Sequence, residues 1–340
     1  PFVQKRLSGF IADEHSNKLK TEVKIGNVDI GLLNRIIIHD LHVKDQKKGN
    51  LLDVSDLSAK FKIMPLFEGK IVISSVQIFN FYLNVNRKDN NSPTNLQFII
   101  DALSSKDKKA KSSKIDLRIN SLLIQHGNFK YDVISLPKTE GRFNTSHIDV
   151  SNLSGIVSLK ALRNDSLNAR VRRLQFKEKS GIDLQRFSFR VIGNKKKLSI
   201  SNIDIKLPSS SLRLNNIVFT YNELKNLPRF SDDVRFSGNV IAQISPNDLS
   251  SFVPVMSNYR DDINISIRIS GNNDKVVCSR FNMTDKLGME INGEAYIDGL
   301  KSKNPEVSLT LFNSNLTNSN INNIVNSFRI SLPAPITERK

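Results

Sequence analysis

The chain has 340 residues and a mass of 38.4 kDa, which is enough for about two domains or one long repetitive domain. Hydrophobic residues make up 39% of it, which excludes the weakly hydrophobic, disordered class. The net charge of +17 suggests a membrane surface or a nucleic acid as partner. The single cysteine, Cys278, excludes an internal disulfide and a multi-cysteine zinc site. No apolar run approaches the roughly 18 to 20 residues of a membrane-spanning helix.

Helical spacing of apolar residues predicts only four short helices. The first is an apolar stripe of Val3, Leu7, Phe10 and Ile11. The others are a segment over 98–103 that Thr94 or Asn95 could cap, a segment that begins after Ser245, and a last segment over 321–328.

Most of the chain follows the period of two that is typical of strands with one polar and one apolar face. In residues 263–269 isoleucines occupy every second position, and Asn264, Ser266 and Arg268 lie between them. Turn signals such as Asn304-Pro305 separate these segments. The pattern predicts a mainly β fold of about fifteen antiparallel strands. The same alternation occurs over 79–86, 115–120, 187–191, 203–207 and 307–311.

A short imperfect repeat reads apolar, any residue, Ser or Asn, apolar. Its copies begin at Ile25, Ile73, Ile119, Ile200 and Leu214. Apolar positions three apart point to opposite faces of a regular strand, so a shared face requires an extra residue, as in a β-bulge or a tight corner. One interpretation is that the repeat encodes a sheet that bends. The other is that Ser and Asn mark loops between strands.

A charged stretch interrupts the pattern once. Residues 105–114 contain several lysines and predict a basic linker or loop, which would separate an N-terminal β region, 1–104, from a continuing β region, 115–340. One continuous domain is the competing interpretation.

Motifs for catalysis are missing from the sequence. His39-Asp40-Leu41-His42 is the densest group of metal-ligating side chains, but two histidines three apart in a regular strand face opposite sides, which favours a structural or exposed role. Cys278 lies in an apolar run and is expected to be a small buried residue rather than a nucleophile. No phosphate loop, dinucleotide fingerprint, nucleophile elbow or H-E-x-x-H motif occurs. We expect a protein that is not an enzyme and uses no cofactor or metal.

The charge alone does not favour a nucleic acid as partner. Single-strand binders expose aromatic rings to stack on bases, whereas the Phe residues here mostly occupy the apolar positions of strands. The apolar strand faces raise a different question, because four short helices cannot cover them. The sheet must pack on another sheet, close on itself or leave an apolar trough. A trough would suit an acyl chain, since each buried CH₂ contributes about 0.8 kcal/mol.

Several stretches carry a family resemblance. They resemble the start of the periplasmic part of the TamB family, the translocation and assembly module inner-membrane subunits, in the form found in Bacteroidetes. The stretches are 3–19, 21–30, 41–45, 51–61 followed by 65–67, 95–103 and 248–254. The similarity extends over most of the chain, its motifs are of low complexity, and none is catalytic. Members of that family are far longer, and their conserved C-terminal domain is not represented.

The resemblance implies an AsmA-like protein, in which a long bent antiparallel sheet curls into a hydrophobic groove. It also implies a location in the periplasm, with an inner-membrane helix upstream of Pro1 as the anchor, and phospholipid as cargo between the inner and outer membranes. A further implication is a link to outer-membrane protein assembly with a barrel partner of the TamA or BamA type.

We therefore expect a lipid conduit whose groove is lined by apolar residues of one-faced strands, with ordinary sheet core as the competing role for each residue. The alternative is a scaffold or chaperone for outer-membrane protein assembly that pairs through exposed strand edges. The candidate lining residues are Phe79, Phe81, Leu83, Val85, Ile115, Leu117, Ile119, Phe187, Phe189, Ile203, Ile205, Ile263, Ile265, Ile267 and Ile269.

Overall fold

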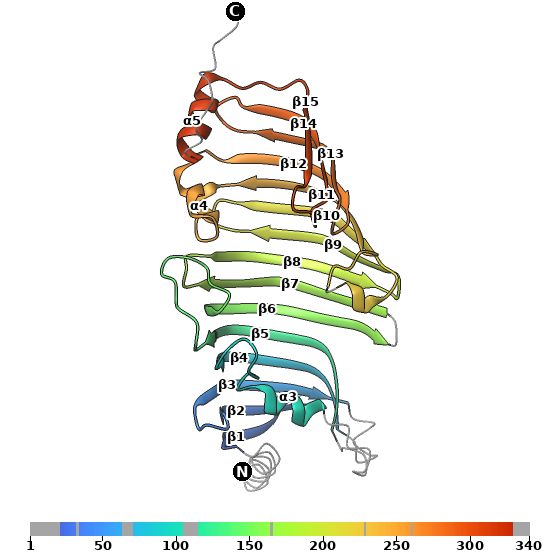
Figure 1. Cartoon of the computed structure of the whole chain (residues 1–340). Coiled ribbons are helices and arrows are strands. Elements are labelled where there is room, and N and C mark those ends of the chain that lie inside the picture. Colours follow the sequence, from blue (N-terminus) through green and yellow to red (C-terminus); the bar gives the residue numbers. More distant parts are fainter. Residues whose placement is uncertain are drawn as a thin grey trace, which may run out of the picture. The chain divides into compact units, whose positions relative to one another are not determined.

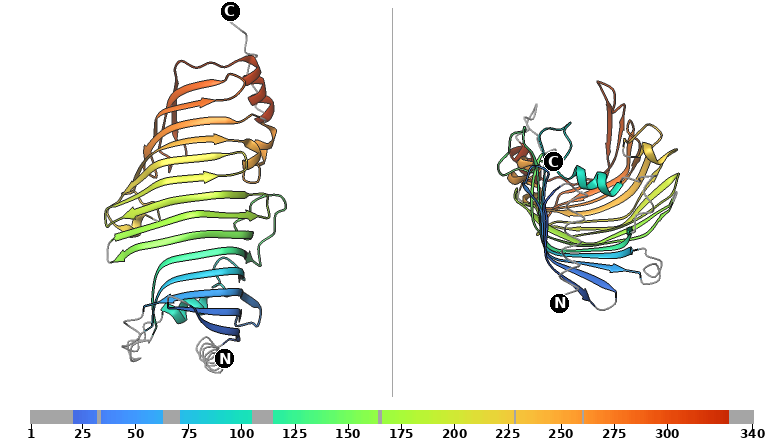
Figure 2. Two further views of the ribbon diagram at one scale, coloured as in Figure 1. Left: turned by 180° about the vertical axis from the view of Figure 1, so that it is seen from behind. Right: turned by 90° about the horizontal axis from the view of Figure 1, so that it is seen from below.

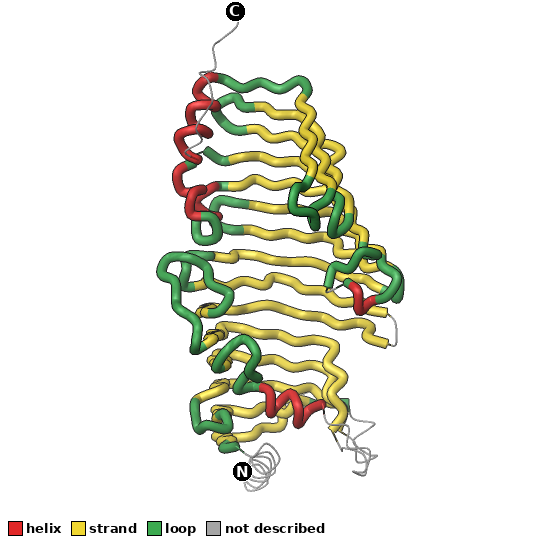
Figure 3. The backbone as a smooth tube through the Cα atoms, viewed as in Figure 1, coloured by secondary structure: helices red, strands yellow, loops and turns green. Residues whose placement is uncertain are grey.

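The computed structural model of the chain is mainly β (Figure 1). Its fifteen strands form one mixed sheet in which each strand lies beside its neighbour in the sequence, and the sheet is not closed. Strands therefore dominate the backbone drawn in Figure 3. The structure describes residues 21–31, 34–62, 71–104, 115–163, 166–227, 229–259 and 261–328. The expected N-terminal helix and the expected linker 105–114 lie outside these residues.

The six predicted alternating segments coincide with six of the fifteen strands. The strands are β1 (Val23–Gly31), β2 (Arg35–Lys44), β3 (Asn50–Phe61), β4 (Ile71–Arg87), β5 (Ile115–Val133), β6 (His147–Arg163), β7 (Ser166–Glu178), β8 (Asp183–Gly193), β9 (Lys197–Lys206), β10 (Ser211–Thr220), β11 (Arg235–Ile244), β12 (Ile263–Gly271), β13 (Val276–Thr284), β14 (Glu290–Asp298) and β15 (Glu306–Leu311). The helices are α3 (Gln97–Ser104), α4 (Pro246–Leu249), α5 (Asn318–Phe328) and the 3-10 helices η1 (Leu224–Asn226) and η2 (Pro254–Asn258).

The expectation of an antiparallel sheet is wrong at one place. Strands β4 and β5 pair in parallel, with Ile78 beside Ile124 and Leu83 beside Phe129. The reason is the connection between them, which contains α3 and returns the chain to the starting end of β4, as a parallel pair requires.

The chain divides into two compact units. Unit 1 consists of Pro1–Lys160 and Val171–Asp183, and unit 2 consists of Ala161–Arg170 and Leu184–Lys340. Both sides of the expected linker, 105–114, belong to unit 1.

Three of the four predicted helices lie within the described residues and are confirmed as α3, α4 and α5. Helix α3 lies against one face of the first strands of unit 1 in Figure 1 and in both views of Figure 2. In unit 2, α4 and α5 lie at the ends of strands rather than across a face. Thr317 and Asn320 hold the start of α5 by reciprocal hydrogen bonds, in which the Asn320 N–H donates to Thr317 Oγ1 and the Thr317 N–H to Asn320 Oδ1.

Three of the five copies of the repeat contain a strand irregularity of the kind that the bending interpretation requires, those that begin at Ile73, Ile200 and Leu214. In unit 1, Asp40, Asn80 and His126 have left-handed backbones with φ of 52°, 50° and 54° inside strands, and the register between β4 and β5 shifts between Ile73 and Ser75. We call each left-handed position a corner. Asn80 and His126 lie two residues after the copies that begin at Ile73 and Ile119, and Asp40 lies outside any copy.

Corners also occur in unit 2. Asn202 has a φ of 53°, and the register between β10 and β11 shifts between Leu214 and Ile217. Asn215 and Asn216, between these two apolar residues, are both exposed. Two consecutive exposed residues reset the alternation, so apolar residues three apart share one face.

Candidate functional site: the apolar faces of the sheet

Cross-strand pairing in unit 2 aligns the apolar residues of successive strands into rows. One row crosses β9 to β15 by direct pairs. Because directly paired residues point to the same face, the row lies on one side of the sheet. Its members are Ile203, Leu214, Val240, Ile267, Phe281, Gly293 and Leu311.

Two further rows run from β8 to β15 on the same side. The first contains Val191, Ile200, Ile217, Gly238, Ile269, Cys278, Ala295 and Leu309. The second contains Gly193, Leu198, Phe219, Phe236, Gly271, Val276, Ile297 and Val307. None of these row members carries a charged or hydrogen-bonding side chain, with the weak thiol of Cys278 as the one exception. We call this side the apolar face of unit 2.

Unit 1 has an apolar face of the same construction. One row joins β1 to β6 through Val23, Val43, Leu52, Leu83, Phe129 and Val150, and another through Val28, Ile38, Leu57, Ile78, Ile124 and Gly155. Val28 is fully buried, and it lies three residues after Ile25 of the first repeat copy.

Parts of both faces are covered. In unit 1, Leu96, Phe98 and Ile99 at the start of α3 pack on a core of Val23, Val43 and Leu51. In unit 2, the connection between β10 and β11 brings Leu227 and Phe230 onto a core of Leu198, Tyr221 and Val234. These clusters are ordinary hydrophobic core.

The isoleucines of β12 differ from these clusters. Ile263, Ile265, Ile267 and Ile269 are all half-buried, while the residues between them are exposed. Of their partners on β11, Ala242 is buried, and Val240 is half-buried. These isoleucines do not reach the complete burial of Leu51, which belongs to the core on which residues of α3 pack.

Most candidate lining residues lie on the apolar faces. Phe81 and Val85 are buried, Leu83 packs beside α3, and Ile203 is buried beside the half-buried Ile205. The rings of Phe187 and Phe189 contact each other with centroids 4.8 Å apart. Ile115, Leu117 and Ile119 belong to β5, but their side chains lie outside the described residues.

The prediction for Phe79 is wrong. Its alternation with Phe81 suggested a shared face, but the corner at Asn80 lies between them. Phe79 pairs with Asp56 and Gln125, so it belongs to the polar side of unit 1.

The two histidines of β2 are placed differently from the expectation. The corner at Asp40 separates His39 from His42, so both project from the polar side. Each ring faces carboxylates: His39 Nδ1 lies 2.6 Å from Asp56 and Nε2 lies 3.2 Å from Asp29, while His42 Nδ1 lies 2.7 Å from Asp53. In the described part of the chain, no group of three or more His, Cys, Asp or Glu side chains is arranged to hold a metal ion.

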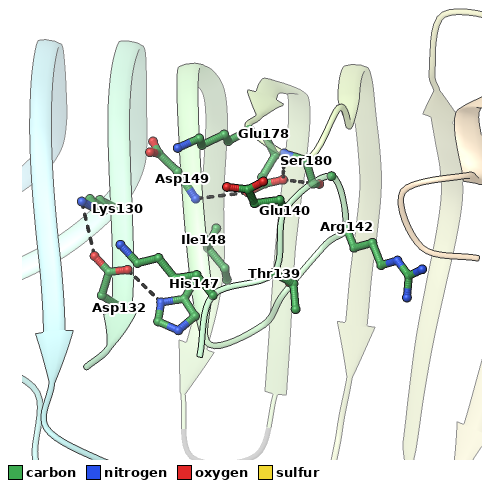
Figure 4. A pocket seen from close by; sticks show the side chains of 13 residues that line it. Lys130, Asp132, Thr139, Glu140, Arg142, His147, Ile148, Asp149, Glu178 and Ser180 are labelled. Atoms are coloured by element: carbon green, nitrogen blue, oxygen red, sulfur yellow. Dashed lines mark hydrogen bonds and ion pairs between the residues drawn. The ribbon is translucent and has the colours of Figure 1, made fainter. Parts of the chain in front are cut away.

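Unit 1 also contains a polar pocket that the sequence did not indicate (Figure 4). Its volume is about 360 Å³, and residues 138–142 of the β5–β6 connection form one wall opposite side chains of β5, β6 and β7. The side chain of His147 is 9% exposed. Its Nδ1 atom lies 3.0 Å from Asp132, and its Nε2 atom donates to the Leu136 carbonyl at 2.9 Å.

The charges of this pocket balance. Burial alone would raise the pKa of Asp132, but the hydrogen bond with His147 and the charge of Lys130 outweigh it and lower the pKa. Glu178 is buried and accepts hydrogen bonds from the Asp149 and Ser180 backbones at 3.2 and 2.7 Å. The remaining exposed lining residues include Lys138, Arg142 and Lys179 as well as Glu140 and Asp149. This mixture selects neither an anion nor a cation.

Cys278 lies on the apolar face, less buried than the sequence predicted. It is half-buried, and burial raises the pKa of its thiol, which disfavours the reactive thiolate.

Sequence reasoning missed one residue that shapes the apolar face of unit 1, Gly127, and identified Asn95 only as a possible helix cap. Gly127 of β5 leaves space for the Phe81 ring, whose Cε1 and Cζ atoms would lie 2.1 Å from any added Cβ. Asn95 ties the start of α3 to the sheet. The available signal was Gly127 itself, because a glycine inside a strand often marks a close approach.

None of the helices in the described ranges has the length and hydropathy to cross a bilayer. Comparison of the chain with protein-family models, curated proteins and solved structures finds no match in any of the three.

Proposed function

We propose that the chain is a non-enzymatic carrier of phospholipid, in which the apolar face of each unit lines a groove that shields acyl chains. The observation that supports this most directly is the set of uninterrupted apolar rows across β8 to β15. An acyl chain lying along such a row gains about 0.8 kcal/mol for each CH₂ it buries. The lack of polar anchors in the rows would make binding indifferent to the head group.

The charge of the chain supports the same proposal. A net charge of +17 attracts an anionic bilayer surface, which is where a lipid carrier collects and delivers its cargo. In the proposed setting the protein works in the periplasm, between the inner and outer membranes, with an outer-membrane barrel of the TamA or BamA type as a partner.

Site-specific photocrosslinking tests the proposal. A photoreactive residue at Ile267 lies on the half-buried part of the apolar face, whereas the same residue at Ser266 lies on the opposite side of the same strand. We expect phospholipid adducts at position 267 and none at 266 after expression in cells. Leu83 is a poorer position because it packs in the core beside α3.

Protein adducts without lipid at position 267, or equal lipid adducts at both positions, would contradict the proposal. Native mass spectrometry of the purified chain provides an independent measurement, with phospholipid masses retained on the wild type as the expected result.

A further inference from the structure

The polar pocket of unit 1 lies on the side of the sheet opposite the apolar face. Lys130 of β5 pairs directly with Asp149 of β6, one position along from Phe129 and Val150 of an apolar row. Neighbouring residues of a strand point to opposite faces, so Lys130 and Asp149 project from the polar side. A ligand in this pocket is therefore a different molecule from an acyl chain on the apolar face.

The wall of the pocket is held in place by hydrogen bonds of the chain itself (Figure 4). The carbonyl of Leu136 accepts from His147 Nε2 at 2.9 Å, and the carbonyl of Pro137 accepts from Asn144 Nδ2 at 3.2 Å. Both ends of the segment 138–142 are thus tied down beside a space of about 360 Å³. Since a water molecule occupies about 30 Å³, this space suits a ligand of about ten non-hydrogen atoms.

The charges of the lining restrict the kind of ligand. Four basic and four acidic side chains line the pocket, although the chain as a whole has a net charge of +17. Asp132 lies within ion-pair distance of His147 and Lys130, at 3.0 and 3.4 Å, and Glu178 accepts from backbone N–H groups. A site for an anion needs an excess of positive charge and a site for a cation an excess of negative charge. The balance favours a molecule that carries both signs and has no net charge.

The other charged side chains of the pocket do not neutralise one another. Within the described residues, the carboxylates of Glu140 and Asp149 form no ion pair, and the same is true there of the ammonium groups of Lys138 and Lys179. The Lys179 N–H donates to the Asp149 carbonyl at 3.0 Å, so even residues with adjoining backbones leave their charges unpaired. The side chain of Arg142 points away from the others in Figure 4. Two acids and two lysines therefore remain for a ligand.

We propose that this pocket binds a free α-amino acid. The carboxylate of the ligand pairs with Lys138 and Lys179, and its ammonium group pairs with Glu140 and Asp149, through charge-assisted hydrogen bonds. An amino acid matches the pocket in size and in its lack of net charge. A phosphorylated amine matches less well, because a phosphate group brings a charge of about −1.5 to −2. This inference does not depend on lipid binding.

Isothermal titration calorimetry of the full chain with glycine, L-serine, L-glutamine and L-glutamate tests the proposal. We expect at least one of them to bind with a Kd below about 1 mM. The N-acetyl derivative of the amino acid that binds lacks the positive charge, and its carboxamide lacks the negative charge. We expect each derivative to bind about tenfold more weakly or worse, because one pair of charged partners is lost.

Two charge variants locate the binding, and two matched variants control for the lost charge. Asp149→Asn and Lys179→Gln each remove one exposed charge from the pocket and should weaken binding about tenfold. Glu294→Gln and Lys303→Gln remove the same charges from exposed positions of unit 2 and should leave binding unchanged.

Three results would overturn the proposal: no binding of any of the four amino acids, equal binding of the parent amino acid and its two derivatives, or equal weakening by the pocket variants and the unit 2 variants. Binding of phosphoethanolamine without binding of an amino acid would identify a phosphorylated amine as the ligand and would also overturn it. None of these results affects the phospholipid adducts expected at Ile267, so the two proposals are tested separately.

Discussion

Asn80 of β4 and His126 of β5 occupy matching positions in the register, and both have a left-handed backbone. A left-handed conformation costs an L-residue about 1–2 kcal/mol, and asparagine tolerates it better than most. Two neighbouring strands therefore turn at the same place, which keeps their backbones paired on both sides of the corner.

The corner at Asn80 predicts a specific response to substitution. Asn80→Val should lower the free energy of unfolding by about 1–2 kcal/mol, because a β-branched residue is strained at positive φ, and Asn80→Gly should cause no comparable loss. Urea denaturation measures both effects. Gln77→Val, on the same strand but at an ordinary φ, is the control and should change little. An equal loss in Asn80→Val and Gln77→Val would contradict the corner.

Asn95 should hold α3 against the apolar face of unit 1. Its Oδ1 accepts from the Asn86 N–H at 2.9 Å, and its Nδ2 donates to the Asn84 carbonyl and to Asp45 at 3.1 and 3.2 Å. Asn95→Ala leaves these part-buried groups without partners and should cost about 1–3 kcal/mol. Hydrogen exchange should then accelerate in α3 and in the neighbouring strands.

The matched control for Asn95 is Gln97→Ala, which removes an exposed hydrogen bond to Asp101 within α3. It should leave the exchange of the sheet unchanged. Similar exchange in the two variants would show that Asn95 does not hold the helix.

Asp132 should make the stability of unit 1 sensitive to acid. Its pKa is lower in the folded chain than its ordinary value of 3.8, despite the opposing effect of burial, so the carboxylate contributes stability above that value. This contribution is lost as the pH falls below 3.8 through the folded pKa. Asp132→Asn should therefore lower stability at neutral pH and flatten the dependence of stability on pH in acid.

Thermal unfolding across the acid range measures the effect of Asp132→Asn. Asp149→Asn, an exposed carboxylate in the same pocket, should keep the pH dependence of the wild type. Parallel curves for the wild type and Asp132→Asn would contradict the prediction.

The ionisation of Tyr259 should destabilise unit 2 at alkaline pH. Burial raises its pKa to about 12, and the charge of Asp285, which accepts the phenol hydrogen bond at 3.2 Å, adds to the shift. The protonated phenol thus stabilises the fold fully below pH 10, and this stability is lost as the pH rises from about 10 to 12. Ultraviolet titration should show a late tyrosinate step that Tyr259→Phe removes and Tyr82→Phe retains. Loss of that step in Tyr82→Phe would contradict the assignment.

Local sequence patterns predicted much of the fold because strand alternation and helix caps act over a few residues. The isoleucines of β12 and the segment after Thr94 are examples. The repeat predicted bends, but one sequence could not show which strand positions are left-handed, so Phe79 was placed on the wrong face and His39 and His42 on opposite faces. The parallel pair of β4 and β5 depends on the path of a long connection, which residue periodicity does not record.

The candidate site was predicted unevenly for a related reason. Apolar positions could be assigned within each strand, but the rows exist only through pairing between strands. Which part of a face is covered depends on distant segments, such as α3 above Leu83 or Phe230 above Leu198. The polar pocket likewise joins residues of a long loop to three strands.

The alignment of Asn80 with His126 restricts how a chain of this kind changes length during evolution. Deleting one residue between a turn and its corner would misalign that strand with both neighbours at once. Gaining or losing a complete hairpin leaves every remaining corner opposite its partner. Relatives of this protein should therefore differ by whole hairpins, while the distance from each turn to its corner is conserved.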